Sequence, residues 1–169
     1  RTLEKVEDQE GVSACGKRLA ARAGANDVRT RDQWSTAKWG DVAIGALATF
    51  GEDRFLLSGP DVIIGPRATL SLSLMLHELA TNAAKYGALT APAGRVAVDW
   101  VVRRDGDMDR LDLCWTERGG PAAAEPTRKG FGSRLIRMGL TGSGGVELRY
   151  EAQGLTVTAT APLYQVQEA

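Results

Sequence analysis

One stretch of this chain constrains its fold more than any other: residues 66–86 have the composition and spacing of a long amphipathic helix. Proline stands at its first position, where a missing backbone N–H costs nothing, and Gly87 follows its last residue. On a helical wheel, one set of apolar residues falls within an arc of about 80°. These residues are Leu72, Leu76, Leu79, Ala83 and Tyr86. The pattern predicts a helix that packs on a sheet through this stripe.

The same helix has a second, polar flank formed by Glu78, Asn82 and Lys85, which fall within an arc of about 60°. A carboxamide oxygen is a suitable ligand for Mg²⁺, and an ammonium group can meet phosphate oxygens. A carboxylate can orient or deprotonate an attacking group. Taken alone, such a flank is more commonly a solvated helix face on which Glu78 attracts Lys85, so the functional interpretation depends on other segments of the chain.

Downstream of this helix, the hydrophobic period changes to the alternation of half-buried strands. Residues 96–103 and 111–116 alternate in this way around the turn Asp105-Gly106-Asp107, which predicts an antiparallel hairpin. The following loop, 118–130, is rich in Gly, Pro and Ala and has no period. A second helix is expected at 131–140, and a closing hairpin at 146–150 and 155–161.

Upstream, a short helix is expected at 41–50 with Asp41 as its N-cap, followed by two short strands at 54–57 and 61–64. Turn residues between these two strands predict that they pair with each other. Together these elements predict the α+β class, a two-layer sandwich with helices on one face of a mixed, mostly antiparallel sheet.

Length and charge exclude several classes of protein. The 169 residues fit one domain, and 21 basic residues balance 21 acidic ones, which argues against non-specific nucleic-acid binding. No apolar run reaches the roughly 18 to 20 residues of a membrane span. The chain begins with Arg1 and has no signal peptide, so we expect a cytoplasmic fragment of a longer protein.

Three segments resemble, in the expected order, the sequence boxes of GHKL ATPases. HELATNAAKYGAL at 77–89 resembles the N box, and GFGSRLI at 130–136 resembles the second glycine box. WTERGGP at 115–121 resembles the first glycine box in the W-x-E form of HWE sensor histidine kinases. The resemblance extends from about residue 34 to residue 162, and three ordered matches are far more specific than a lone glycine motif. It implies the GHKL, or Bergerat, type of ATP-binding sandwich.

For the N box, the resemblance implies that Asn82 coordinates Mg²⁺ and that Glu78 is the carboxylate that polarises the phosphate acceptor. Lys85 matches a basic residue near the phosphates of ATP. His77 is the signature histidine of the family. Two alternatives stay open for it: direct action on nucleotide or acceptor, and a hydrogen-bonded histidine on the helix surface.

For the glycine boxes, the resemblance places Glu117 where other GHKL proteins have an Asp that binds the exocyclic amine of adenine. The alternation agrees, because Glu117 and Trp115 share the face of the strand that the helices cover. Trp115 is expected to be a core anchor. The glycines are expected to let the backbone approach the nucleotide, at the base in the first box and at the phosphates in the second. The residues concerned are Gly119, Gly120, Gly130, Gly132 and Ser133.

The function implied is transfer of the ATP γ-phosphate to a histidine, for relay to an aspartate of a response regulator. Two alternatives are an anti-sigma-type serine kinase and a degenerate nucleotide-binding platform that only docks partners. The His77 and W-x-E spellings count against the first. The intact Glu78, Asn82 and Lys85 count against the second.

The chain contains one histidine, and it lies in the N box. Residues 1–33 are therefore interpreted as a partial remnant of a dimerisation hairpin and its connection, without the acceptor helix. Residues 34–169 are interpreted as the catalytic ATP-binding domain. The partners expected are the acceptor hairpin of the intact homodimer and a response regulator.

Overall fold

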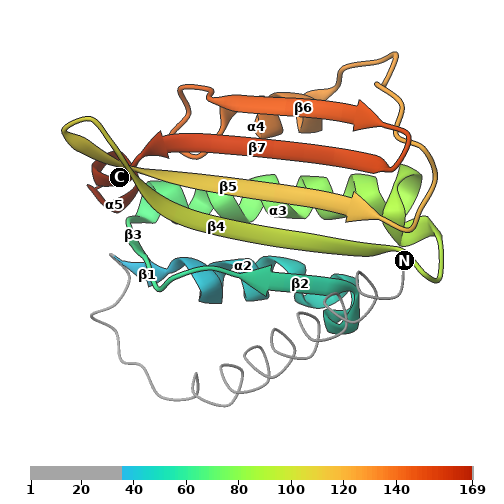
Figure 1. The fold of residues 1–169 in the computed structure, drawn as a ribbon, viewed down its shortest axis with the longest axis horizontal. Coiled ribbons are helices and arrows are strands. Elements are labelled where there is room, and N and C mark those ends of the chain that lie inside the picture. Colours follow the sequence, from blue (N-terminus) through green and yellow to red (C-terminus); the bar gives the residue numbers. More distant parts are fainter. Residues whose placement is uncertain (1–35, 169) are drawn as a thin grey trace.

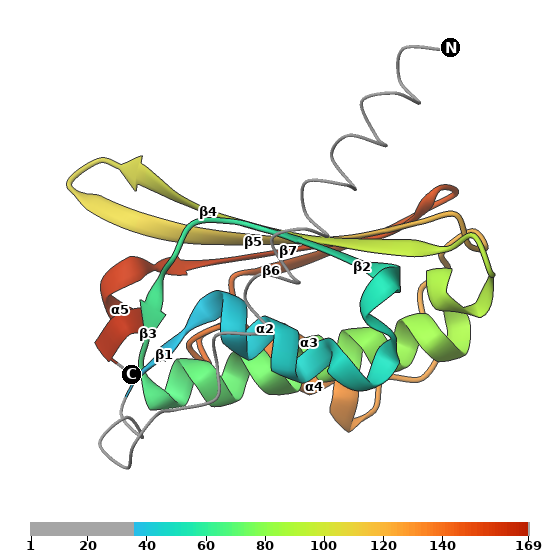
Figure 2. The ribbon, with the colours of Figure 1, turned by 90° about the horizontal axis from the view of Figure 1, so that it is seen from below.

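A computed structural model describes residues 36–168 of the chain. A five-stranded sheet forms one layer, and helices cover one of its faces to form the second layer (Figures 1 and 2). This architecture confirms the predicted two-layer α+β sandwich. The predicted hairpin remnant, residues 1–33, lies outside the described residues.

The central element of the helical layer is α3, Pro66–Tyr86, which has the bounds that the sequence predicts. It ends at Gly87, whose backbone N–H donates to the carbonyl of Ala83. Four residues of the predicted stripe are fully buried against the sheet, as expected: Leu72, Leu76, Leu79 and Ala83. The fifth, Tyr86, is 74% exposed, so the prediction was wrong for this residue. Tyr86 is the last residue of the helix and lines the mouth of a cavity instead of packing on the sheet.

The sheet has the strand order β2-β4-β5-β7-β6. Its long strands form the two predicted hairpins, and β5 also pairs antiparallel with β7. The strands concerned are β4 (Arg95–Asp105), β5 (Met108–Arg118), β6 (Val146–Glu151) and β7 (Gly154–Pro162). Trp115 is completely buried and packs on Phe55 with ring centroids 6.1 Å apart, which confirms that it is a core residue.

The edge of the sheet differs from the prediction. Strand β2, Phe55–Ser58, pairs with β4 in parallel, and β3, Ile63–Ile64, pairs with β1, Ala37–Lys38, in a separate two-stranded sheet. The two short strands therefore do not pair with each other. The backbone of β2 forms its hydrogen bonds with β4, a parallel strand that follows only after α3 in the sequence. Turn residues next to β2 cannot indicate a partner so far along the chain.

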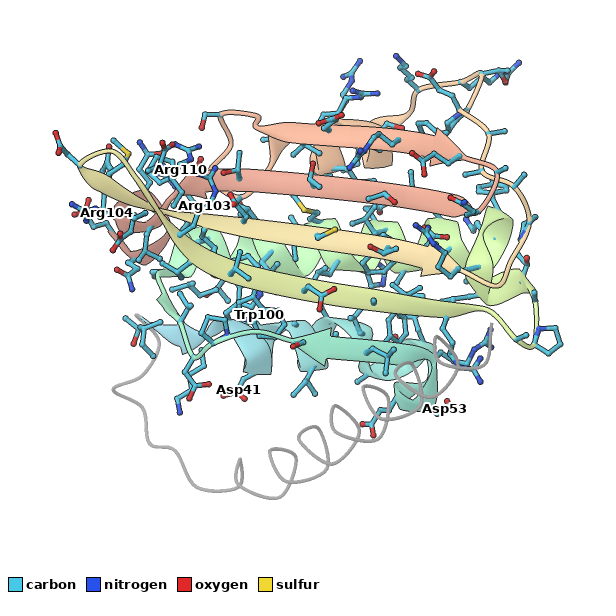
Figure 3. The ribbon with its side chains drawn as sticks, in the orientation of Figure 1. Asp41, Asp53, Trp100, Arg103, Arg104 and Arg110 are labelled. Atoms are coloured by element: carbon cyan, nitrogen blue, oxygen red, sulfur yellow. The ribbon has the colours of Figure 1, made fainter. Side chains whose placement is uncertain are left out.

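Helix α2, Trp39–Leu47, packs beside α3 and starts before the predicted position. Lys38 is its N-cap, so the expected N-cap role of Asp41 was wrong, and this residue lies in the first turn. A carboxylate there is still favourable, because the N-terminus of a helix carries partial positive charge. Trp39 of α2 contacts Trp100 of β4 with ring centroids 6.2 Å apart, which ties this helix to the sheet. Trp100 is labelled in Figure 3.

The remaining helices are short. Helix α4, Phe131–Met138, follows the long loop and contacts α3, whereas α5, Leu163–Glu168, was not predicted and packs against β5 and β7. Of the helices between residues 36 and 168, none combines the length and the apolar character that crossing a membrane would require.

Candidate active site

A cavity of about 700 Å³ opens beside the C-terminal half of α3. Its other walls are the end of β5, residues 121–130 of the following loop, the first turns of α4 and parts of β6 and β7. A volume of this size is typical of small-molecule sites. The helical layer and the sheet thus leave one end of the sandwich open to a ligand.

Six of the predicted site residues line this cavity, although they come from three separate segments of the chain. They are Glu78, Asn82, Glu117, Gly130, Gly132 and Ser133. The first two lie one helical turn apart on α3, and their side chains are half-buried. The fold therefore brings the carboxylate and the carboxamide of the N box to the same space as the carboxylate of the first glycine box.

Glu117 is buried at the end of β5, with 2% of its surface exposed. Its Oε1 accepts a hydrogen bond of 3.0 Å from the backbone N–H of Ala88, and its Oε2 accepts one of 3.0 Å from Trp115 Nε1. A buried carboxylate needs such donors to replace water. Each carboxylate oxygen has two lone pairs, so both oxygens keep capacity for a further donor from the cavity.

Glu78 lies close to the start of α4. A Cβ atom added to Gly132 would meet the Glu78 carboxylate, so the glycine leaves room for this carboxylate in its present position. Gly130, the N-cap of α4, makes no side-chain capping bond. No side chain caps the first backbone N–H groups of α4, which lie at the cavity wall. Such N–H groups stabilise a negatively charged ligand.

The glycines of the first box lie next to the turn after α3. Gly119 and Gly120 do not line the cavity. A Cβ added to Gly119 would collide with the backbone of Ala93, and one added to Gly120 would collide with the backbone of Ala88. Gly119 also has a φ of 80°, which favours glycine. Both glycines bring the end of β5 against the turn after α3, so the close approach is between two backbone segments.

His77 and Lys85 also lie outside the cavity lining. The His77 ring is exposed and meets the Phe50 ring edge-on, with centroids 5.5 Å apart. This contact joins α3 to the turn that follows α2. Lys85 is exposed on the last turn of α3, one turn beyond the cavity-lining Asn82.

The curated proteins that this chain resembles are named blue-light-activated histidine kinases. The chain is similar to the blue-light-activated histidine kinase of Brucella anthropi, with 38% identity over 96% of this chain and 34% of that protein. The protein of the same name from Brucella ovis is 32% identical over 96% of this chain and 35% of its own length. The chain thus spans about a third of the length of these relatives.

The solved structure of the mycobacterial sensor histidine kinase MprB matches with a TM-score of 0.53 and 16% identity. The match covers 75% of this chain and 95% of that structure. The chain belongs to the histidine kinase catalytic domains. No family model matches it. Its fold is the GHKL type that the sequence boxes imply.

The structure also places in the cavity residues that the sequence did not reveal. Arg128, Lys129 and Arg137 line the cavity and supply basic groups from loop 119–130 and α4. The only signal was the pair Arg128-Lys129 directly before the second glycine box. Lys129 pairs at 3.9 Å with Glu125, which also lines the cavity, and Arg128 and Arg137 contribute further positive charge.

Tyr150 of β6 is a further cavity residue that the sequence did not reveal. Burial raises the pKa of its phenol, the Arg137 guanidinium lowers it, and the negative charges of Glu125 and Glu117 raise it. The net effect is a higher pKa, so the phenol keeps its proton at neutral pH. Tyr150 therefore presents a hydroxyl that can donate a hydrogen bond within the cavity.

Proposed function

We propose that this domain binds ATP in the cavity and transfers its γ-phosphate to a histidine that is not present in this chain. The observation that carries the proposal is the arrangement of two carboxylates in one cavity. Glu117 is buried at the end of β5, and Glu78 lies beside Asn82 at the free N-terminus of α4. Glu117 suits the recognition of a nucleotide base that offers N–H groups. Glu78 suits proton transfer beside a bound phosphate group.

In this proposal, the exocyclic amine of adenine donates a hydrogen bond to Glu117. The carboxylate is held by Ala88 and Trp115 and keeps free lone pairs toward the cavity. Guanine has a carbonyl where adenine has this amine, and two acceptors facing each other repel. Glu117 would therefore select ATP over GTP.

The phosphates of ATP would lie toward the start of α4, where backbone N–H groups and the basic residues Arg128, Lys129 and Arg137 offset their charge. In the part of the chain that the structure describes, no cluster of three His, Cys, Asp or Glu side chains could hold a metal ion. A Mg²⁺ ion would thus be bound by the phosphates with Asn82 as protein ligand, a donor that suits this ion. When bound, it would neutralise charge on the phosphates.

In the transfer step, an imidazole nitrogen of the acceptor forms a bond to the γ-phosphorus while the bond from this phosphorus to the bridging oxygen breaks, and ADP leaves. The other imidazole nitrogen carries a proton, which Glu78 would hold and so make the imidazole more nucleophilic. Lys85, exposed one turn beyond Asn82, would meet incoming negative charge. For His77, the contact with Phe50 supports a role in holding α3 against the neighbouring turn.

The acceptor would belong to the dimerisation hairpin of the intact homodimer, and the phosphoryl group would pass to an aspartate of a response regulator. The likeness to histidine kinases supports both partners. We place the relay in the cytoplasm because it consumes ATP.

Substitution of Glu117 tests the assignment of the base. The unchanged domain is expected to prefer ATP over GTP by about 1 to 3 kcal/mol, or roughly fivefold to 150-fold in affinity. Glu117→Gln should remove most of this preference, because a carboxamide can also donate to the guanine carbonyl. Equilibrium binding of both nucleotides measures the ratio, and thermal melting checks that the variant is folded. Similar affinities for ATP and GTP in the unchanged domain would refute the assignment.

A further inference from the structure

We infer that Trp115 and the turn Gly87-Ala88 are positioning elements that hold the Glu117 carboxylate in one orientation and thereby set the base selectivity of the site. The inference rests on the proposed recognition of adenine by Glu117. It concerns how the protein fixes this group, and it gives functions to three residues that have no direct part in the chemistry.

Trp115 holds the carboxylate from the strand side. It stands two residues before Glu117 on β5, so both side chains lie on the helix-covered face. Its ring is completely buried and packs on Phe55, which limits its movement. Its Nε1–H donates to Glu117 Oε2 over 3.0 Å. In the W-x-E motif, the tryptophan donor and the glutamate acceptor are thus two residues apart, a spacing that places their side chains next to each other on the same face of a strand.

The turn after α3 holds the carboxylate from the helix side. The backbone N–H of Ala88 donates to Glu117 Oε1 over 3.0 Å. A Cβ on Gly87 would collide with the same oxygen, so only glycine leaves room for the carboxylate in this position. Ala88 is itself enclosed, because a Cβ on Gly94 or Gly120 would collide with its backbone. The donor therefore has little freedom to move.

With one donor on each oxygen, rotation of the Glu117 carboxyl group would break at least one hydrogen bond in a buried site. A buried carboxylate that loses a donor is destabilised, so the bound orientation is strongly favoured. The remaining lone pairs then point in fixed directions before any ligand arrives, and such preorganisation favours selective binding. The same turn follows directly on the helix that carries Asn82 and Glu78, so the two ends of the cavity share one rigid frame.

The experiment compares two tryptophan variants by ATP and GTP affinity. Trp115→Phe keeps an aromatic ring in the core but removes the donor to Glu117, so the preference for ATP over GTP should fall by roughly tenfold. Trp100→Phe is the matched control, because Trp100 is also buried and its Nε1–H donates to the backbone oxygen of Pro60, away from the cavity. The control should keep the ATP/GTP ratio of the unchanged domain, even where both variants melt at lower temperature.

A glycine pair gives an independent measurement if Trp115→Phe does not fold. Gly87→Ala should lower the ATP/GTP ratio by displacing the carboxylate, whereas Gly45→Ala on α2, where an added Cβ meets no atom within 4 Å, should not. Glu117→Gln is measured alongside. If it loses selectivity while Trp115→Phe and Gly87→Ala keep it, the positioning inference is overturned and the role of Glu117 stands. If Glu117→Gln itself keeps the selectivity, the proposed base recognition fails and the positioning inference fails with it.

Discussion

Replacement of Glu78 by glutamine is expected to slow phosphoryl transfer to an acceptor histidine by about 10²- to 10⁴-fold, the usual contribution of a positioned acid or base. Glutamine keeps the shape that fits against Gly132 but cannot take up the imidazole proton. ATP affinity should stay close to that of the unchanged domain, because Glu78 acts on the acceptor. The measurement is transfer of labelled phosphate from ATP to a separately supplied hairpin that carries the acceptor histidine.

Glu147→Gln is the control for the loss of one negative charge, because Glu147 lies on β6 with a side chain that is 70% exposed and outside the cavity lining. It should transfer phosphate at the rate of the unchanged domain. A Glu78→Gln variant that also transfers at this rate would show that the carboxylate has no part in the reaction. Loss of ATP binding together with transfer would indicate a structural role instead.

Replacement of Asn82 by alanine is expected to weaken binding of Mg·ATP by about tenfold to a hundredfold, the range found when groups that support a metal site are removed. Binding of metal-free ATP should change much less, because the carboxamide is proposed to contact the ion. Asn82→Asp tests the same point with a residue of similar size. Titrations with Mg²⁺ and with a chelator in its place measure the two affinities.

Lys85→Ala provides the comparison for this second prediction. Lys85 lies one turn beyond Asn82 and carries charge but no metal-binding oxygen, so its removal should not weaken Mg·ATP binding selectively. Equal losses of Mg·ATP and metal-free ATP in Asn82→Ala would contradict the metal-ligand role. Such a result would point to a contact between Asn82 and the nucleotide itself, or to its packing at the cavity wall.

The sequence predicts the elements that depend on local patterns. Helix α3 has the expected bounds because Pro66 and Gly87 mark its ends and one apolar stripe runs along it. The β4–β5 hairpin follows from alternation around Gly106. The N box and glycine boxes also identify residues that meet at one cavity, among them Glu78, Asn82 and Glu117.

The remaining features depend on contacts between distant segments. Tyr86 has the period of a core residue, but the cavity mouth lies beside it instead of the sheet. The parallel partner of β2 lies beyond α3, and no turn signal can indicate it. Arg137 and Tyr150 reach the cavity because α4 and β6 flank it, which neither residue's neighbours in sequence reveal. Local patterns identify elements, whereas the three-dimensional arrangement decides which side chains share a site.

The parallel pair β2–β4 has a consequence for how the chain folds. The β4–β5 and β6–β7 hairpins close short loops, whereas β2 joins β4 only after an excursion that contains the whole of α3. The entropy cost of closing a loop grows with its length. A chain that has formed only its hairpins thus has no docked α3, and Glu78 and Asn82 do not yet face Glu117. ATP, if it binds as proposed, would then contribute its binding free energy to the completed fold alone and shift the folding equilibrium toward it.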